Sequence, residues 1–288
     1  MTAAEFIYTV LLRPRPLKAL ANRMLRLLVK PDLHIHGAVV ALNPNDPVVS
    51  GALTLGVYER AETRFFLHAC RPGMTVLDVG ANVGYYSALA MRILQERGTI
   101  VAMEPDPESF SYLQKTVAAN GTAKVICVRK AAAAESGEAT LFVSRENRGD
   151  NRLYANEFGT DSLQVPAVAV DDLLAELGIA QVNLVKMDVQ GFEGHVLRGM
   201  TRTITQSASL IVLMEFWPHG LRSAGFEPRQ IFTDCERLGL QVFTLARDGR
   251  LQRLEDPEAV IRAHPGRKYT NLVAVKGVEF LDELMVRR

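Results

Sequence analysis

Short apolar runs alternate with stretches of helical periodicity along most of the chain after residue 74. The apolar runs predict seven strands, at residues 75–80, 99–104, 124–128, 182–188, 209–216, 241–246 and 271–276. Apolar positions at helical spacing predict helices at residues 85–95, 108–119, 192–200 and 228–238. Continuous apolar strands that are joined by helices are typical of a parallel sheet covered on both faces. The sequence therefore predicts a doubly wound, mostly parallel α/β fold.

Two segments depart from this alternation. Residues 139–144 and 163–170 flank a polar loop, which predicts an inserted β-hairpin. The first thirty residues carry six bases and one acid, and apolar positions recur at helical spacing from residue 17 to 29. We therefore expect a basic helical extension at residues 1–50 and one domain at residues 51–288. The basic helix has two interpretations: it packs on this protein or a second subunit, or it makes peripheral contact with an anionic membrane.

The overall composition is that of a folded protein, with 48% apolar and 23% charged residues in a chain of 288. A formal net charge of +1 gives no field that would gather nucleic acid, so we expect no nucleic-acid partner. The three cysteines are far apart, which favours a reducing, cytoplasmic location over a disulfide scaffold or a zinc site. No run reaches the roughly 18 apolar residues of a spanning helix, so we expect no integral membrane segment. The oligomeric state stays open.

A glycine-containing turn follows the first predicted strand, in VLDVGANVGYYSAL at residues 76–89. Glycines at such a turn let the backbone approach a ligand beside the N-terminus of the next helix. The dinucleotide pattern G-x-G-x-x-G fails here, because Asn82 and Tyr85 occupy its second and third glycine positions counted from Gly80. Asp78 would repel a phosphate but attract a cationic amino group. The turn therefore predicts a ligand with positive charge near the glycines.

A second acid, Glu104, closes the next strand 26 positions after Asp78. In α/β nucleotide sites a carboxylate at this place accepts hydrogen bonds from ribose hydroxyls. A ribose joined to a cationic amino-acid end describes S-adenosylmethionine. The alternative is that Asp78 and Glu104 only cap helices, but two acids at the ends of neighbouring strands fit a binding site better.

With these motifs in order, the chain resembles the FkbM-type S-adenosylmethionine-dependent methyltransferases over residues 45–276. The resemblance includes MEPDPESFSYLQKTVAAN, VAVDDLL, LVKMDVQGFEGHVLRGM and LIVLMEFWP. It implies a Rossmann-like class I methyltransferase fold and methyl transfer to a hydroxyl of a small molecule or glycan. The family's cofactor motif falls on Asp78, Gly80, Asn82, Gly84 and Glu104, and its acidic segment falls on Asp188, Gly191 and Glu193. Tyr85 and Pro105, which follow Gly84 and Glu104 directly, are further candidates for cofactor binding. Gln190 departs from the family's usual Glu, so we assign it no acid role.

Acids at the ends of the later strands are the candidates for catalysis. Asp188 is the first candidate for general base, because a weakly acidic hydroxyl needs a proton acceptor; its alternative role is to cap the next helix. Glu193 either completes the acidic site or interacts with the helix dipole. His195 is a further candidate base. Glu215 could contact the acceptor, and together with Asp188 it could supply oxygen ligands to Mg²⁺.

The loop of residues 144–154 is rich in Arg and Asn, and the resemblance places it near the acceptor. Arg148, Asn151 and Arg152 are therefore candidates for binding a polar or anionic substrate, with a solvated loop as the alternative. Trp217 is either an aromatic platform for a sugar ring or a core residue. A rival hypothesis in another class is a non-catalytic protein that keeps the fold and docks through its basic N-terminus.

Overall fold

The computed structural model describes residues 30–121, 123–144, 147–155 and 161–286. The predicted basic helix at residues 17–29 lies outside these ranges, so it and the docking role attached to it remain predictions. Within the described ranges, no helix combines the length and the apolar character needed to cross a membrane.

The central sheet has eight strands in the order β12-β11-β13-β10-β9-β3-β4-β5. In chain order the strands are β3 (Thr75–Val79), β4 (Thr99–Met103), β5 (Lys124–Val128), β9 (Leu184–Met187), β10 (Leu210–Phe216), β11 (Gln241–Leu245), β12 (Leu251–Arg253) and β13 (Thr270–Lys276). The first five are parallel to one another, and β13 runs antiparallel between β10 and β11. All seven predicted strands are present. The short edge strand β12 is additional, because three residues carry too little apolar pattern to predict it.

The strand order reverses between β3 and β9. From β3 the chain proceeds outward through β4 and β5, and it later returns to the other side of β3 to form β9 and β10. Ligands of open α/β sheets bind beyond the carboxyl ends of the strands at such a switch point. The fold therefore places its ligand crevice beside the residues that follow β3, β4, β9 and β10.

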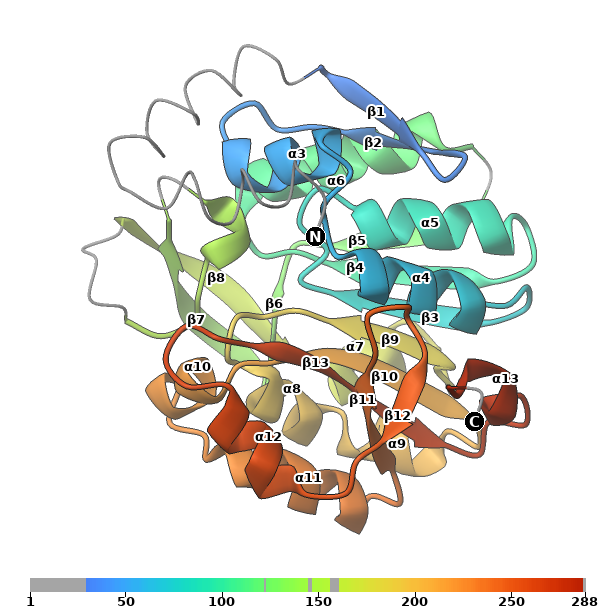
Figure 1. Cartoon of the computed structure of the whole chain (residues 1–288). Helices are drawn as coiled ribbons and strands as arrows, with labels where there is room; N and C mark the ends of the chain where they lie inside the picture. Colours follow the sequence, from blue (N-terminus) through green and yellow to red (C-terminus); the bar gives the residue numbers. More distant parts are fainter. Residues whose placement is uncertain (1–29, 122, 145–146, 156–160, 287–288) are drawn as a thin grey trace.

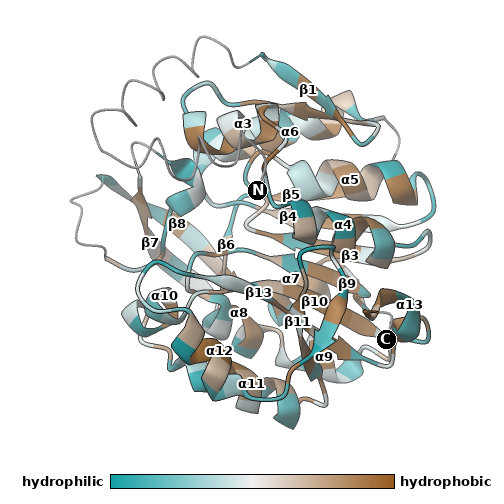
Figure 2. Cartoon of the chain, in the orientation of Figure 1, coloured by the Kyte–Doolittle hydropathy of each residue, from teal (hydrophilic) through white to brown (hydrophobic). Residues whose placement is uncertain are grey.

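Side chains that alternate along each strand form two separate cores. On β3, Val76 packs with the core on one face of the sheet, whereas Leu77 and Val79 pack with the core on the other. The helices are α3 (Pro47–Thr54), α4 (Arg60–Ala69), α5 (Tyr85–Leu94), α6 (Pro107–Ala119), α7 (Val170–Glu176), α8 (Glu193–Gly199), α9 (Thr201–Gln206), α10 (Pro218–Ser223), α11 (Pro228–Arg237), α12 (Pro257–Ala263) and α13 (Leu281–Leu284). Figure 1 shows α4 and α5 on one side of the sheet and α8, α9 and α11 on the other, and Figure 2 shows the strands between them as mostly hydrophobic. Burial of apolar surface on both faces thus fixes the sheet between its helices.

The inserted hairpin belongs to a second, three-stranded sheet. Strands β7 (Gly137–Val143) and β8 (Asp161–Ala169) are antiparallel, as the sequence predicts, and β6 (Ala131–Ala133) pairs with β8 in parallel. A short 3-10 helix, η2 (Arg148–Asp150), lies in the loop that follows β7. This sheet carries the Arg- and Asn-rich loop to the carboxyl edge of the central sheet (Figure 1).

Residues before the central sheet pack on its helices. Strands β1 (Asp32–Ile35) and β2 (Ala38–Ala41) form an antiparallel hairpin. The Asn120 side chain bonds both backbone groups of Val39, and Thr116 Oγ1 accepts from the Ala41 N–H at 2.9 Å. The predicted boundary at residue 50 falls inside α3, so the described part of the extension is continuous with the domain.

Gly80, directly after β3, combines a positive φ with a close backbone contact. Its φ is +79°, and a Cβ there would lie 2.0 Å from the Asp188 carbonyl oxygen. We expect Gly80→Ala to lower the free energy of unfolding by roughly 3 kcal/mol, because backbone strain and a backbone clash add. Chemical denaturation measures this loss.

Gly73→Ala is the matched control, because Gly73 also has a positive φ, +94°, but open space where its Cβ would lie. Its free energy of unfolding should fall by roughly 1 kcal/mol, because only the backbone strain is added. Equal losses in the two variants would contradict the importance of the Gly80–Asp188 contact.

Candidate functional site

A cavity of about 480 Å³ opens at the carboxyl edge of the central sheet. Its wall includes Gly80 and Asn82 of the glycine turn, Glu104 after β4, Asp188 after β9 and Glu215 near the end of β10. Its size is that of a site for a small molecule or cofactor. The sequence-predicted residues of the first and second halves of the sheet therefore meet in one cavity.

The glycine turn is shaped by close backbone contacts. The amide of Asp188 donates to the Val79 carbonyl at 3.0 Å, and the space of a Cβ on Gly80 is taken by the Asp188 carbonyl. Gly84 has a φ of +85°, and a Cβ there would meet Leu113 of α6. Gly84 thus supports the turn from outside the cavity, whereas Gly80 lines it.

Glu104 is tied to the turn by its carboxylate. Its Oε2 accepts from the Asn82 N–H at 2.9 Å and its Oε1 from the Asp106 N–H at 2.8 Å. Burial raises the pKa of Glu104 to about 8, against the lowering effect of these two donors. The side-chain Oδ1 of Asn82 is buried and has no partner among the described residues. With Pro105 also in the wall, this side of the cavity offers a carboxylate and an unpaired amide oxygen to a polar ligand.

Asp78 and Tyr85 lie under the turn, in a small recess beside the main cavity. Asp78 is 2% exposed and accepts a hydrogen bond from Ser87 Oγ at 2.6 Å. Burial raises its pKa to about 6. The hydroxyl groups of Tyr85 and Thr63 lie 3.0 Å apart. The recess therefore holds the Asp78 carboxylate, with Lys186 in the same lining.

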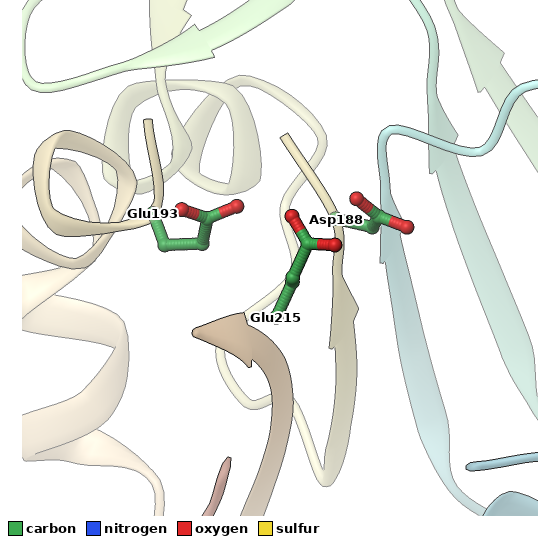
Figure 3. A group of neighbouring side chains, drawn as sticks. All are labelled: Asp188, Glu193 and Glu215. Carbon is green, nitrogen blue, oxygen red and sulfur yellow. The ribbon is translucent and has the colours of Figure 1, made fainter. Parts of the chain in front are cut away.

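Three carboxylates lie close together beside the ends of β9 and β10. Asp188, Glu193 and Glu215 each place an oxygen within 4.8 Å of the others, and Figure 3 shows Glu215 between the other two. Burial raises the pKa of Glu193 to about 7, and burial together with the charges of Asp188 and Glu193 raises that of Glu215 well above its ordinary value. Clustered carboxylates in a dry site hold protons or attract cations.

Glu193 has a local role at the first turn of α8. Its Oε1 accepts from the amides of Val189 and Gly191, at 3.1 and 3.2 Å, whereas its buried Oε2 has no partner among the described residues. The side chain is completely buried behind the cavity wall. Glu193 therefore shapes the turn that carries Asp188 and adds negative charge to it.

Gln190, the departure from the family pattern, joins the two acids that face the cavity. Its Nε2 donates to Asp188 Oδ1 at 2.7 Å and to Glu215 Oε2 at 3.3 Å. The oxygen ligands that Mg²⁺ prefers are present in Asp188, Glu193 and Glu215. The Gln190 amide already donates to both Asp188 and Glu215, so a cation held by these carboxylates would compete with it.

His195 does not reach the cavity in the described structure. Its Nε2 pairs with the Ala224 carbonyl at 2.9 Å, and its ring stacks on Phe192 and meets the edge of Phe226. In this contact Nε2 is the donor, because a carbonyl oxygen only accepts. This position fits packing, so we leave His195 out of the mechanism.

The opposite wall is formed by the Arg- and Asn-rich loop. Arg148 pairs with Asp106, 3.0 Å away, and with Glu108, so it fastens η2 to the start of α6. Asn151 Oδ1 accepts from the Ser144 amide at 2.9 Å, and its Nδ2 is buried without a partner among the described residues.

Arg152 pairs with Asp150 and lies 4.7 Å from the ring centre of Trp217. Trp217 is 7% exposed, and its Nε1 donates to the Gly266 carbonyl at 2.7 Å. The cavity is lined by all four predicted residues, Arg148, Asn151, Arg152 and Trp217.

Three further residues belong to the site and were not predicted. Glu59, which precedes α4, and Tyr269, which precedes β13, line the cavity, and Lys186 of β9 lies in the adjoining recess. Lys186 had a detectable signal, because a charged residue inside the apolar run VNLVKMD needs a buried partner. Glu59 and Tyr269 had no such signal in the sequence, since only the folded chain brings them to this edge of the sheet.

The sequence of the chain is similar to those of known methyltransferases. The model described as the Methyltransferase FkbM domain matches residues 78–235, a little over half of the chain. The Hexuronic acid methyltransferase AglP of Haloferax volcanii is 27% identical over 156 residues, which are 54% of this chain and 61% of that protein. Methyltransferase 1 of Beauveria bassiana is 28% identical over 43% of this chain and 57% of its own length. The chain thus spans about three fifths of these two relatives.

Solved structures of methyltransferases also resemble the fold. One is a putative methyltransferase from Streptococcus mutans in complex with SAH, with a TM-score of 0.44 and 6% identity over 74% of this chain and 93% of that chain.

Proposed function

The chain belongs to the FkbM methyltransferase family, and from this premise we propose that it transfers the methyl group of S-adenosylmethionine to a hydroxyl of a sugar or other small molecule. The observation that carries the proposal is the single cavity between Glu104 on one side and Asp188 on the other. A methyl transferase must hold a methyl donor and an acceptor oxygen in line. A cavity with a nucleoside-binding wall and a proton-accepting wall supports that arrangement.

The residues around the glycine turn fit the proposed cofactor. Glu104 offers carboxylate oxygens to ribose hydroxyls, and the buried Asn82 Oδ1 is an acceptor without a partner among the described residues. Asp78 gives the recess the negative charge that an amino group needs. When bound, S-adenosylmethionine supplies an electrophilic methyl group on a positively charged sulfur.

Asp188 is the proposed general base. Its carboxylate faces the cavity and is oriented by Gln190 Nε2 at 2.7 Å. It takes the proton of the acceptor hydroxyl while the oxygen–methyl bond forms and the sulfur–methyl bond breaks, and the sulfur keeps the electron pair. Glu215 lines the cavity beside Asp188 and Glu193 lies behind it, and burial raises the pKa values of both.

A sugar is the acceptor class that the wall favours. Asn151 Nδ2 is a donor without a partner among the described residues, and sugar hydroxyls need such polar partners. Trp217 is 7% exposed and the Arg152 guanidinium lies over its ring, so Trp217 contributes to the wall by packing and not as an open platform. The relative named Hexuronic acid methyltransferase supports a sugar acceptor.

Cofactor binding is the first test. Glu104→Gln should weaken binding of S-adenosylmethionine and S-adenosylhomocysteine by about tenfold, because a charged acceptor for two hydroxyls is lost. Ionised Glu104 is the better acceptor and its pKa is raised to about 8, so wild-type affinity should fall as the pH is lowered through 8. Calorimetric titration over this range measures both effects.

Glu96→Gln is the control, since that carboxylate is exposed after α5. Unchanged affinity in Glu104→Gln, with a folded protein, would remove Glu104 from the cofactor site. No binding by the wild-type protein would overturn the proposed cofactor.

Turnover tests the base. With a hydroxylated sugar acceptor found by screening, Asp188→Asn should lower kcat by about 100-fold or more while cofactor affinity changes little, because only proton removal is lost. Radiolabelled methyl transfer measures the rate. The control is Asp282→Asn, which makes the same substitution at an exposed position in α13. Equal kcat values in the two variants would contradict the role of Asp188.

Removal of metal tests the acidic cluster. The Gln190 amide donates a hydrogen bond to Asp188 and the Lys186 ammonium lies 3.7 Å from it, so we expect turnover to stay within about twofold after dialysis against EDTA. Added Mg²⁺ should not raise it. Loss of turnover in EDTA and its recovery with Mg²⁺ would instead make Asp188, Glu193 and Glu215 a magnesium site.

A further inference from the structure

Tyr269 is an aromatic residue of the cavity wall that is open to solvent. It is 57% exposed, whereas Trp217 is 7% exposed and has the Arg152 guanidinium over its ring. The other exposed large apolar residues in the described part of the chain are Leu55 and Val286, and neither lines the cavity. A large aromatic side chain that is exposed inside a cavity offers surface for a ligand to cover.

The Tyr269 side chain also differs from the other tyrosines in its contacts. Five tyrosines of the described ranges each have a ring, cation or hydrogen-bond partner there: Tyr58, Tyr85, Tyr86, Tyr112 and Tyr154. Among the same residues, no such partner contacts the side chain of Tyr269. Its ring therefore has no packing role that accounts for an aromatic residue at this position.

The segment that carries Tyr269 is held on both sides. Before it, the Gly266 carbonyl accepts a hydrogen bond from Trp217 Nε1 at 2.7 Å. After it, β13 begins at once, and Thr270 pairs with Phe216 of β10. A ligand that covers the Tyr269 ring therefore meets a backbone that is already in place, so binding does not have to order the chain first.

The sheet places Tyr269 on the same side as two of the carboxylates. Asn271 is the register partner of Glu215, and its side chain donates to Glu62 of α4. Residues two apart along an extended chain point to the same face, so Tyr269 faces the α4 side together with Glu215. Because β13, β10 and β9 are neighbours (Figure 1), Tyr269, Glu215 and Asp188 follow one another across the sheet. Two strand spacings are about 10 Å, which one acceptor molecule can span.

We propose that Tyr269 is the stacking platform for the acceptor, and that the acceptor is a sugar ring that lies on Tyr269 with its hydroxyls toward Glu215 and Asp188. This inference deepens the proposed function and rests on it. The face of an aromatic ring is negatively polarised and attracts the C–H groups of a sugar ring. Carboxylates accept hydrogen bonds from sugar hydroxyls. A purely apolar ligand would cover these carboxylates without giving them partners, which costs free energy.

Binding of simple glycosides tests the platform without turnover. The probes are the methyl glycosides of glucose, galactose and mannose, titrated with and without S-adenosylhomocysteine and followed by saturation-transfer difference NMR. Irradiation of the protein's aromatic protons should transfer saturation to the ring protons of at least one probe. Tyr269→Ala should weaken its binding about tenfold, because the stacking surface is lost. Tyr269→Phe should recover most of this loss, because it keeps the ring.

Three comparisons isolate the effect of the ring. Tyr269→Leu keeps apolar bulk without an aromatic face, so it should bind the glycoside as weakly as Tyr269→Ala, and it serves if that variant fails to fold. Sorbitol has hydroxyls but no ring, so its binding should not change in either variant. Tyr112→Ala is the matched control, because Tyr112 lies on α6 outside the cavity wall. Its glycoside affinity should match that of the wild type.

Two results of the binding experiment would overturn the inference. One is equal glycoside affinity in the wild type and in folded Tyr269→Ala and Tyr269→Leu. The other is a wild-type protein that binds none of the three glycosides under either condition.

Turnover separates this inference from the proposed function. With a sugar that the protein methylates, Tyr269→Ala should raise the KM for the acceptor about tenfold and change kcat less than about threefold, because the platform acts on binding. Methyl transfer with an unchanged KM would overturn the platform while the proposed function stands. Glycoside binding that depends on Tyr269, without methyl transfer to any glycoside, would uphold the platform while the proposed function fails.

Discussion

The site depends on the contact between the chain after β3 and the chain after β9. The Asp188 amide bonds the Val79 carbonyl, and the Asp188 carbonyl occupies the space that a side chain on residue 80 would need. Because this contact leaves no free space, the glycine turn and the acidic turn are held in one fixed relation. The wall that fits a nucleoside and the carboxylate proposed as base are thereby joined without an intervening element.

Electrostatics is the second constraint at this junction. Burial raises the pKa values of the site's carboxylates Glu59, Asp78, Glu104, Glu193 and Glu215, because it takes them out of water. The Lys186 ammonium opposes this effect from within the sheet, 3.6 Å from Glu59 and 3.7 Å from Asp188. The positive charge of the proposed cofactor would likewise favour ionised carboxylates.

The second sheet completes the cavity. It brings η2 and the loop after it to the carboxyl edge of the central sheet, and Arg148 fastens this loop to Asp106 at the start of α6. Asp106 follows Glu104 by two residues and donates its amide to the Glu104 carboxylate. One short segment of chain therefore supports both the proposed nucleoside wall and the loop of the acceptor wall.

Local patterns in the sequence predicted seven strands of the central sheet, the helices α5, α6, α8 and α11, the glycine turn and the acids at the strand ends. They did not predict the shorter elements, among them α3, α4 and the β1–β2 hairpin. Apolar periodicity indicates which face of an element is buried. The position of a glycine or an acid at the end of a strand can likewise be predicted from local sequence alone. The family resemblance, confirmed over residues 78–235, rests on the same local features.

The tertiary structure decided which of these residues act together. It brought Glu59 and Lys186 to Asp188, turned Glu193 to backbone amides, paired Arg148 with Asp106 and packed His195 among aromatic rings. Each of these roles depends on the segment that lies opposite. The sequence pattern does not show which segment lies opposite, because charge pairing and burial are properties of groups that only folding brings together.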